Sequence, residues 1–89
     1  MGAAAAETAM IYLWRRGSGL EVKVVKYDGS GKLEESSSFA AIRQVAVRSP
    51  EEVRISAQIV GEPLCVVVKA PKIGIRASGG LLVVEGTRP

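Results

Sequence analysis

Few side chains in this sequence could carry out chemistry. There is one cysteine, Cys65, and no histidine. A cysteine nucleophile needs a base that removes its proton and surroundings that lower its pKa. Cys65 lies in the apolar run LCVVV, so we interpret it as a packed structural residue. Enzymes that depend on histidine are excluded.

The carboxylates offer no better site. Four of the nine acidic residues occur as two adjacent pairs, Glu34-Glu35 and Glu51-Glu52. Neighbouring side chains diverge on a strand and point about 100° apart on a helix. One thiol and no imidazole leave a metal ion only such carboxylates. We therefore predict a protein that is not an enzyme, with no catalytic residue, metal site or cofactor.

Two glycine-rich segments superficially suggest phosphate-binding loops. These are Gly17-Ser18-Gly19 and residues 28–32, DGSGK. A P-loop requires GxxxxGK followed by Ser or Thr and then a helix, whereas Lys32 is followed by Leu33 and Glu34. Both segments are therefore interpreted as turns.

Length and composition predict one small globular domain. The chain has 89 residues, of which 47% are hydrophobic and 24% charged, and this composition is not that of a disordered chain. The net charge of +3 permits an anionic partner without requiring one. The absence of Asn and His and a charge carried mostly by Arg and Glu are typical of heat-adapted proteins.

Nothing in the sequence indicates a membrane or an export signal. No apolar run reaches the roughly 18 residues that a spanning helix needs. The start, MGAAAAETA, lacks the basic region of a signal peptide. We expect a cytoplasmic protein with no membrane contact.

The clearest structural signal is residues 10–27, which predict a β-hairpin with the three-residue loop 17–19. This register places Trp14 opposite Val22 and Tyr12 opposite Val24. Because side chains alternate along a strand, one face is predicted to be the core. That face carries Met10, Tyr12, Trp14, Val22 and Val24. The outward face carries Ile11, Leu13, Val25 and Lys23 with the pair Arg15 and Glu21.

The middle of the chain is ambiguous between helix and strand. Residues 32–38 are polar and expected to be exposed, and within 39–48 a strand over 42–47 is favoured. Ser49-Pro50-Glu51-Glu52 is a capping box, and Gly61 and Pro63 supply a stop. Residues 53–59 alternate as in a half-buried strand, but the agreeing start and stop signals predict a helix over 50–60.

Three further strands are predicted at 64–69, 73–77 and 81–85. The fold class is therefore α+β, a small sheet-dominated single domain of about five or six largely antiparallel strands with one helix near 50–60. An all-β barrel or sandwich is the alternative. Residues 1–9 are expected to form a disordered tail, 10–86 the compact domain and 87–89 a flexible C-terminus.

Protein assembly is the first functional interpretation. Several strands carry apolar residues on both faces, and one helix can cover only one face of a sheet. Uncovered apolar surface marks an interface. We expect a self-associating module, a homodimer or a subunit with a protein partner. The candidate interface residues are Ile11, Leu13, Val25 and Tyr27.

Nucleic-acid binding is the alternative. Candidate contacts to the phosphate backbone are Arg15, Arg16, Lys23 and Lys72. Bases could stack on Tyr12, Trp14 or Tyr27. Because the predicted register places Tyr12 and Trp14 in the core, backbone contact is favoured over base recognition.

The end of the chain supports a third interpretation. Residues 79–87, GGLLVVEGT, resemble the closing strand of the C-terminal regulatory domains attached to potassium-transport proteins. The resemblance covers this segment alone, and no site residue is transferred. It implies a ligand-binding regulatory domain. No family is recognised over the whole chain.

Overall fold

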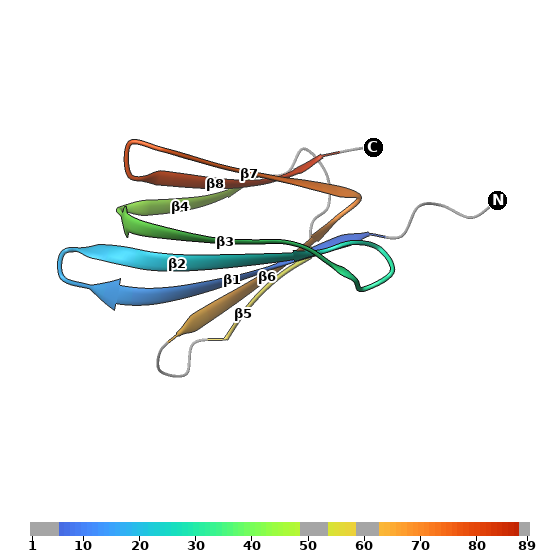
Figure 1. Cartoon of the computed structure of the whole chain (residues 1–89), viewed down its shortest axis with the longest axis horizontal. Helices are drawn as coiled ribbons and strands as arrows, with labels where there is room; N and C mark the ends of the chain where they lie inside the picture. Colours follow the sequence, from blue (N-terminus) through green and yellow to red (C-terminus); the bar gives the residue numbers. More distant parts are fainter. Residues whose placement is uncertain (1–5, 49–53, 59–62, 88–89) are drawn as a thin grey trace.

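The computed structural model describes residues 6–48, 54–58 and 63–87, and within these ranges the chain is all-β, with no helix (Figure 1). The eight strands, in chain order, are β1 (Glu7–Arg16), β2 (Gly19–Tyr27), β3 (Leu33–Ile42), β4 (Gln44–Arg48), β5 (Arg54–Gln58), β6 (Leu64–Ala70), β7 (Lys72–Ser78) and β8 (Leu81–Thr87).

The predicted α+β class is therefore wrong, and the error lies at 50–60. Residues 54–58 of the expected helix form β5, which pairs antiparallel with β6. The remainder of that segment, 50–53 and 59–60, lies outside the described residues, as does the capping residue Ser49. A helix cap contributes only about 1 kcal/mol, and a helix this short is marginal by itself. Pairing with β6 therefore outweighs the local signals.

The strands form two sheets. The large sheet has five strands in the order β3-β2-β1-β6-β5, and every neighbouring pair is antiparallel. The small sheet has three strands in the order β4-β8-β7, with β4 parallel to β8. Figure 1 shows the small sheet at the top of the view and the large sheet below it.

One hydrophobic core joins the two sheets. Its residues are small or branched aliphatic side chains that are at most 4% exposed. They come from β1, β2, β3 and β6 of the large sheet and β7 and β8 of the small sheet: Ala9, Ile11, Val22, Val24, Ile42, Val68, Ala70, Ile73, Leu82 and Val84. The small sheet thus covers one face of the large sheet and leaves its other face outside the core.

The β1–β2 hairpin is present, but its predicted register is wrong by one residue. Arg16 pairs with Gly19, so the turn contains only Gly17 and Ser18. Gly17 has a φ of 59° and Ser18 has no positive φ, as in a type II′ turn with glycine in its first central position. A shift of one residue reverses the faces of β1 relative to those of β2. Leu13 consequently lies opposite Val22.

The turn predicted after the hairpin is confirmed. The Asp28 carboxylate accepts hydrogen bonds from the Ser30 amide (2.9 Å), the Ser30 hydroxyl (2.6 Å) and the Lys32 amide (2.9 Å). These bonds lower the pKa of Asp28. The expected exposed segment 32–38 continues from this turn as part of β3, paired with β2. Its polar sequence gave no strand pattern, and pairing with β2 imposes the extended conformation.

The predicted strand at 42–47 is divided between the sheets. β3 ends at Ile42 in the large sheet, and β4 begins at Gln44 in the small sheet. Ala41 has a φ of 55°, a left-handed conformation that is costly for a residue with a Cβ. The amides of Arg43 and Gln44 donate to the Gly80 carbonyl at 2.7 and 3.2 Å. These two bonds fix the crossing between the sheets.

The last three strands are confirmed at β6, β7 and β8. At the other end, β1 begins at Glu7, before the expected start of the first strand at Met10. Ala9 is completely buried, because a small side chain fits where β1 passes beneath the small sheet.

Candidate functional site

The outer face of the large sheet consists of the residues that alternate with the core residues on β1, β2 and β6. Each of them is exposed or half-buried, whereas the inward residues between them include completely buried ones such as Ile11, Val22 and Val24. They are Thr8, Met10, Tyr12, Trp14, Glu21, Lys23, Val25, Tyr27, Cys65, Val67 and Lys69. No described residue packs over this surface as the small sheet packs over the other one.

Aromatic side chains occupy the centre of the outer face. The ring centroids of Tyr12 and Trp14 are 6.4 Å apart, with ring planes inclined by 31°. Cys65 is the register partner of Tyr12 on β6. Burial raises the pKa of the Tyr12 phenol, and the nearby Cys65 and Tyr27 raise it further. Tyr12 is therefore neutral at physiological pH, and its hydroxyl donates to Met10 Sδ at 3.5 Å.

Two lysines give the outer face a positive field. Lys23 is directly opposite Tyr12 on β2, and Lys69 is opposite Thr8 on β6. Both are exposed, and in the described parts of the chain neither belongs to an ion pair. The acidic residue of the face, Glu21, accepts from Arg16 Nε at 3.1 Å. Its charge is thus already balanced, and the lysine charges remain available to an anion.

The structure separates the four predicted nucleic-acid contacts. Lys23 lies on the outer face, and Arg16 lies at its end, bound to Glu21. Arg15 is exposed on the opposite side of the hairpin end. Lys72 begins β7 in the small sheet, opposite Thr87. These residues therefore do not form one cluster.

The four predicted interface residues are also divided. Ile11 is completely buried and Leu13 packs against the core, so the prediction that they face outward is wrong. Val25 and Tyr27 lie half-buried on the outer face. The corrected register moves Ile11 and Leu13 inward and leaves Val25 and Tyr27 on the outer face.

Sequence reasoning placed Tyr12 and Trp14 in the core and therefore missed them as surface residues. A two-residue turn at Gly17-Ser18, which glycine in the first position favours, would have assigned them correctly. Val67 and Lys69 join the face through the pairing of β6 with β1. No local signal in the sequence predicts that pairing.

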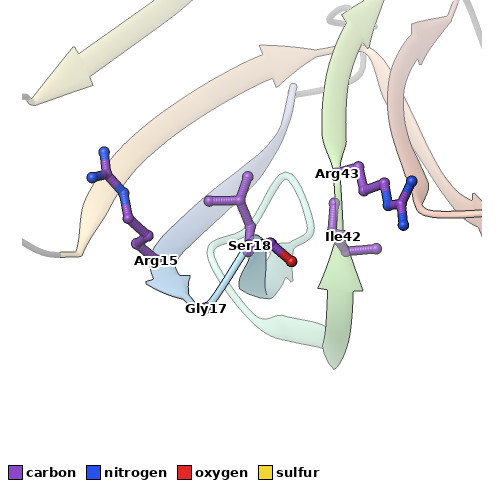
Figure 2. Close-up of a pocket in the computed structure, with 7 residues that line it drawn as sticks. Arg15, Gly17, Ser18, Ile42 and Arg43 are labelled. Carbon is purple, nitrogen blue, oxygen red and sulfur yellow. The ribbon is translucent and has the colours of Figure 1, made fainter.

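A hollow of about 280 Å³ lies beside the hairpin turn. Its lining residues are Arg15, Gly17, Ser18, Gly19, Leu20, Ile42 and Arg43. Figure 2 shows the guanidinium groups of Arg15 and Arg43 pointing away from each other. Two cations that diverge do not clamp one anion, so the hollow does not have the convergent polar groups of a ligand site.

Two other classes of site receive no support. Among the described residues, no three His, Cys, Asp or Glu side chains gather where they could hold a metal ion. In the same ranges there is no helix with the length and apolar character needed to cross a bilayer.

The fold and this face define an open two-sheet β-protein with an uncovered aromatic and basic surface. Comparisons with protein-family models, curated proteins and solved structures find no match. The functional argument therefore rests on the geometry of the outer face.

Proposed function

We propose that this chain is a non-enzymatic binding module that holds single-stranded nucleic acid against the outer face of the large sheet. The bases stack on Trp14 and Tyr12, with Tyr27 as a further aromatic surface. The phosphates lie near Lys23 and Lys69. Cytoplasmic localisation remains a prediction.

The observation that carries this proposal is the juxtaposition of Tyr12, Trp14 and Lys23. Two aromatic rings lie side by side on β1, and the lysine is the cross-strand neighbour of the first ring. Single-strand binders combine these two elements, aromatic rings for the bases and cations for the backbone. Each base–aromatic stack contributes roughly 1–3 kcal/mol and tolerates any base.

A flat sheet face favours single strands over duplexes. Bases in a duplex are stacked on each other and cannot lie on a side-chain ring. Duplex recognition instead needs an element that enters a groove, and no described strand or helix projects from this face. Phosphate contact by the lysines would therefore be the main interaction left for a duplex.

Self-association through the same face is a second candidate. Met10, Val25 and Val67 add half-buried apolar surface around the aromatic rings, and such surface also suits a protein partner. It ranks second because Lys23 lies near the centre of the face. Packing two copies face to face would bury Lys23 and Lys69 together with Glu21, whose carboxylate already accepts from Arg16.

Fluorescence anisotropy with labelled oligonucleotides tests the proposal. We expect a single-stranded pyrimidine oligonucleotide to bind at micromolar protein concentration and low salt, with affinity that falls as salt increases. A duplex of the same length should bind more weakly. Absence of single-strand binding at low salt would eliminate the proposed function. A dimer seen by light scattering in that case would favour the second candidate.

A further inference from the structure

β3 forms one edge of the large sheet along its whole length. It contains ten residues and pairs only with β2. Although Arg43 connects it to β4, the two strands belong to different sheets and are not hydrogen-bonded to each other. In the described ranges, the backbone hydrogen bonds outside the strand ladders involve the 28–32 turn and Gly80. The outward amides and carbonyls of β3 therefore have no backbone partner among the described residues.

The edge of the small sheet that is formed by β7 is protected against pairing with another strand. The Ile73 amide on β7 donates to Glu7 Oε1 at 2.7 Å, and its carbonyl accepts from Lys26 Nζ at 3.2 Å. Pro71, which has no amide proton, directly precedes this strand. Such features keep another strand from pairing with an edge. β4, the other edge of the small sheet, has only five residues and ends at Arg48.

β3 lacks equivalent protection over residues 36–39, because its register with β2 is regular there and becomes irregular between Phe39 and Ile42. Residues 36–42, SSSFAAI, contain no charge and no proline. Ser36, Ser38 and Ala40 are exposed, so the strand is accessible from solvent. Leu33, at its start, is the large hydrophobic side chain that is most exposed, at 55%. Unprotected edges of this kind accept an added strand.

The charge pattern of β3 suits a second copy of the same strand in antiparallel orientation. Pairing centred on Ser37 places Ser36 opposite Ser38, Glu35 opposite Phe39 and Glu34 opposite Ala40. Serine pairs across strands are favourable, and no two carboxylates face each other. Parallel pairing in register would instead stack Glu34 on Glu34 and Glu35 on Glu35.

We propose that two copies of this chain pair through β3, antiparallel and centred on Ser37. The twofold axis of such a pair is perpendicular to the sheet, so the two large sheets join into one continuous sheet. Both outer faces then lie on the same side. If the proposed function holds, one nucleic-acid strand can cross from one copy to the other, but the pairing itself does not depend on that function.

Sedimentation of the protein alone, over a range of concentrations, tests the pairing. The wild type should shift from 9.4 kDa toward twice that mass as concentration rises. Ser36→Glu with Ser38→Glu places like charges opposite each other twice, and should weaken the dimer by about tenfold or more. Ser36→Lys with Ser38→Glu places opposite charges at the same points and should restore it. Ser78→Glu, on exposed β7, is the control and should leave it unchanged.

Both positions are exposed, so the variants should fold, and circular dichroism checks that they do. A wild type that stays monomeric would overturn the proposal. A dimer that the Glu–Glu variant leaves intact would overturn it too and indicate another interface. Because no nucleic acid is present, failure of the pairing is distinguishable from failure of the proposed function.

Discussion

Each sheet has an outer face that carries apolar side chains, and the two faces differ in how far these side chains are covered. On the small sheet, Val83 points away from the core yet is only 4% exposed. Arg76 lies directly opposite it and donates to Glu85 Oε2 at 3.2 Å. On the large sheet, Tyr12 and Trp14 remain half-buried. The register partner of Trp14 is Glu21, which accepts from Arg16 Nε at 3.1 Å, but the register partner of Tyr12 is Lys23, which has no ion pair among the described residues.

This difference favours the large sheet as the face for the proposed partner. Long arginine side chains can cover apolar surface with their stems while the charged ends stay in water. The small sheet uses this arrangement, and its hollow of about 150 Å³ is lined by Arg48, Arg76, Ala77, Ser78, Leu81 and Val83. The large sheet instead leaves its aromatic rings half-buried and its lysines Lys23 and Lys69 exposed, with no ion pair to either lysine among the described residues. We therefore propose that binding involves the large sheet alone.

The largest expected effect comes from removing the central ring. Trp14→Ala should weaken single-strand binding by roughly 10- to 100-fold, because one base stack contributes roughly 1–3 kcal/mol. Trp14→Phe keeps a ring and should lose less. Leu81→Ala, on the outer face of the small sheet, should bind like the wild type. Anisotropy titrations of the three variants check this order, and equal losses for Trp14→Ala and Leu81→Ala would contradict it.

Removing the lysines should change the salt dependence of binding more than it changes the stacking of bases on the aromatic rings. Each phosphate contact on a single strand contributes a slope of about −0.7 in a plot of log K against log salt. Lys23→Gln with Lys69→Gln should therefore make that slope shallower by about 1.4. Arg48→Gln removes a cation from the small sheet and should leave the slope unchanged. If Arg48→Gln matched the double variant, the positive field would not be specific to one face.

The comparison also explains what could be read from the sequence. Strands β6, β7 and β8 were predictable because apolar runs and intervening turns mark them locally. The hairpin was equally clear, but Gly17-Ser18-Gly19 fits a loop of two or three residues. That single ambiguity decides whether Trp14 is core or surface.

The remaining features depend on distant pairing. β5 is a strand because β6 lies beside it, against local signals for a helix, and β3 is a strand because β2 pairs with its serine-rich sequence. Of the candidate site, Lys23, Val25 and Tyr27 were identifiable from the hairpin. Lys69 joins them only through the pairing of β6 with β1. No periodicity in the sequence predicts that pairing.

The smallest expected effect comes from a substitution on the outer face of the small sheet. Glu85→Gln breaks the ion pair with Arg76, whose side chain is 63% exposed. A surface ion pair contributes at most about 1 kcal/mol, so we expect a stability loss below that in chemical denaturation. Binding of single strands should not change. A clear fall in affinity would mean that the small sheet also contacts the ligand.

Fluorescence of Trp14, the one tryptophan in the chain, tests the central claim most directly. The free protein should be quenched by acrylamide, because Trp14 lies on the uncovered face of the large sheet. Adding a single-stranded oligonucleotide at low salt should quench the emission to saturation and protect it from acrylamide. Emission that is insensitive to both acrylamide and oligonucleotide would place Trp14 in the core and contradict the account.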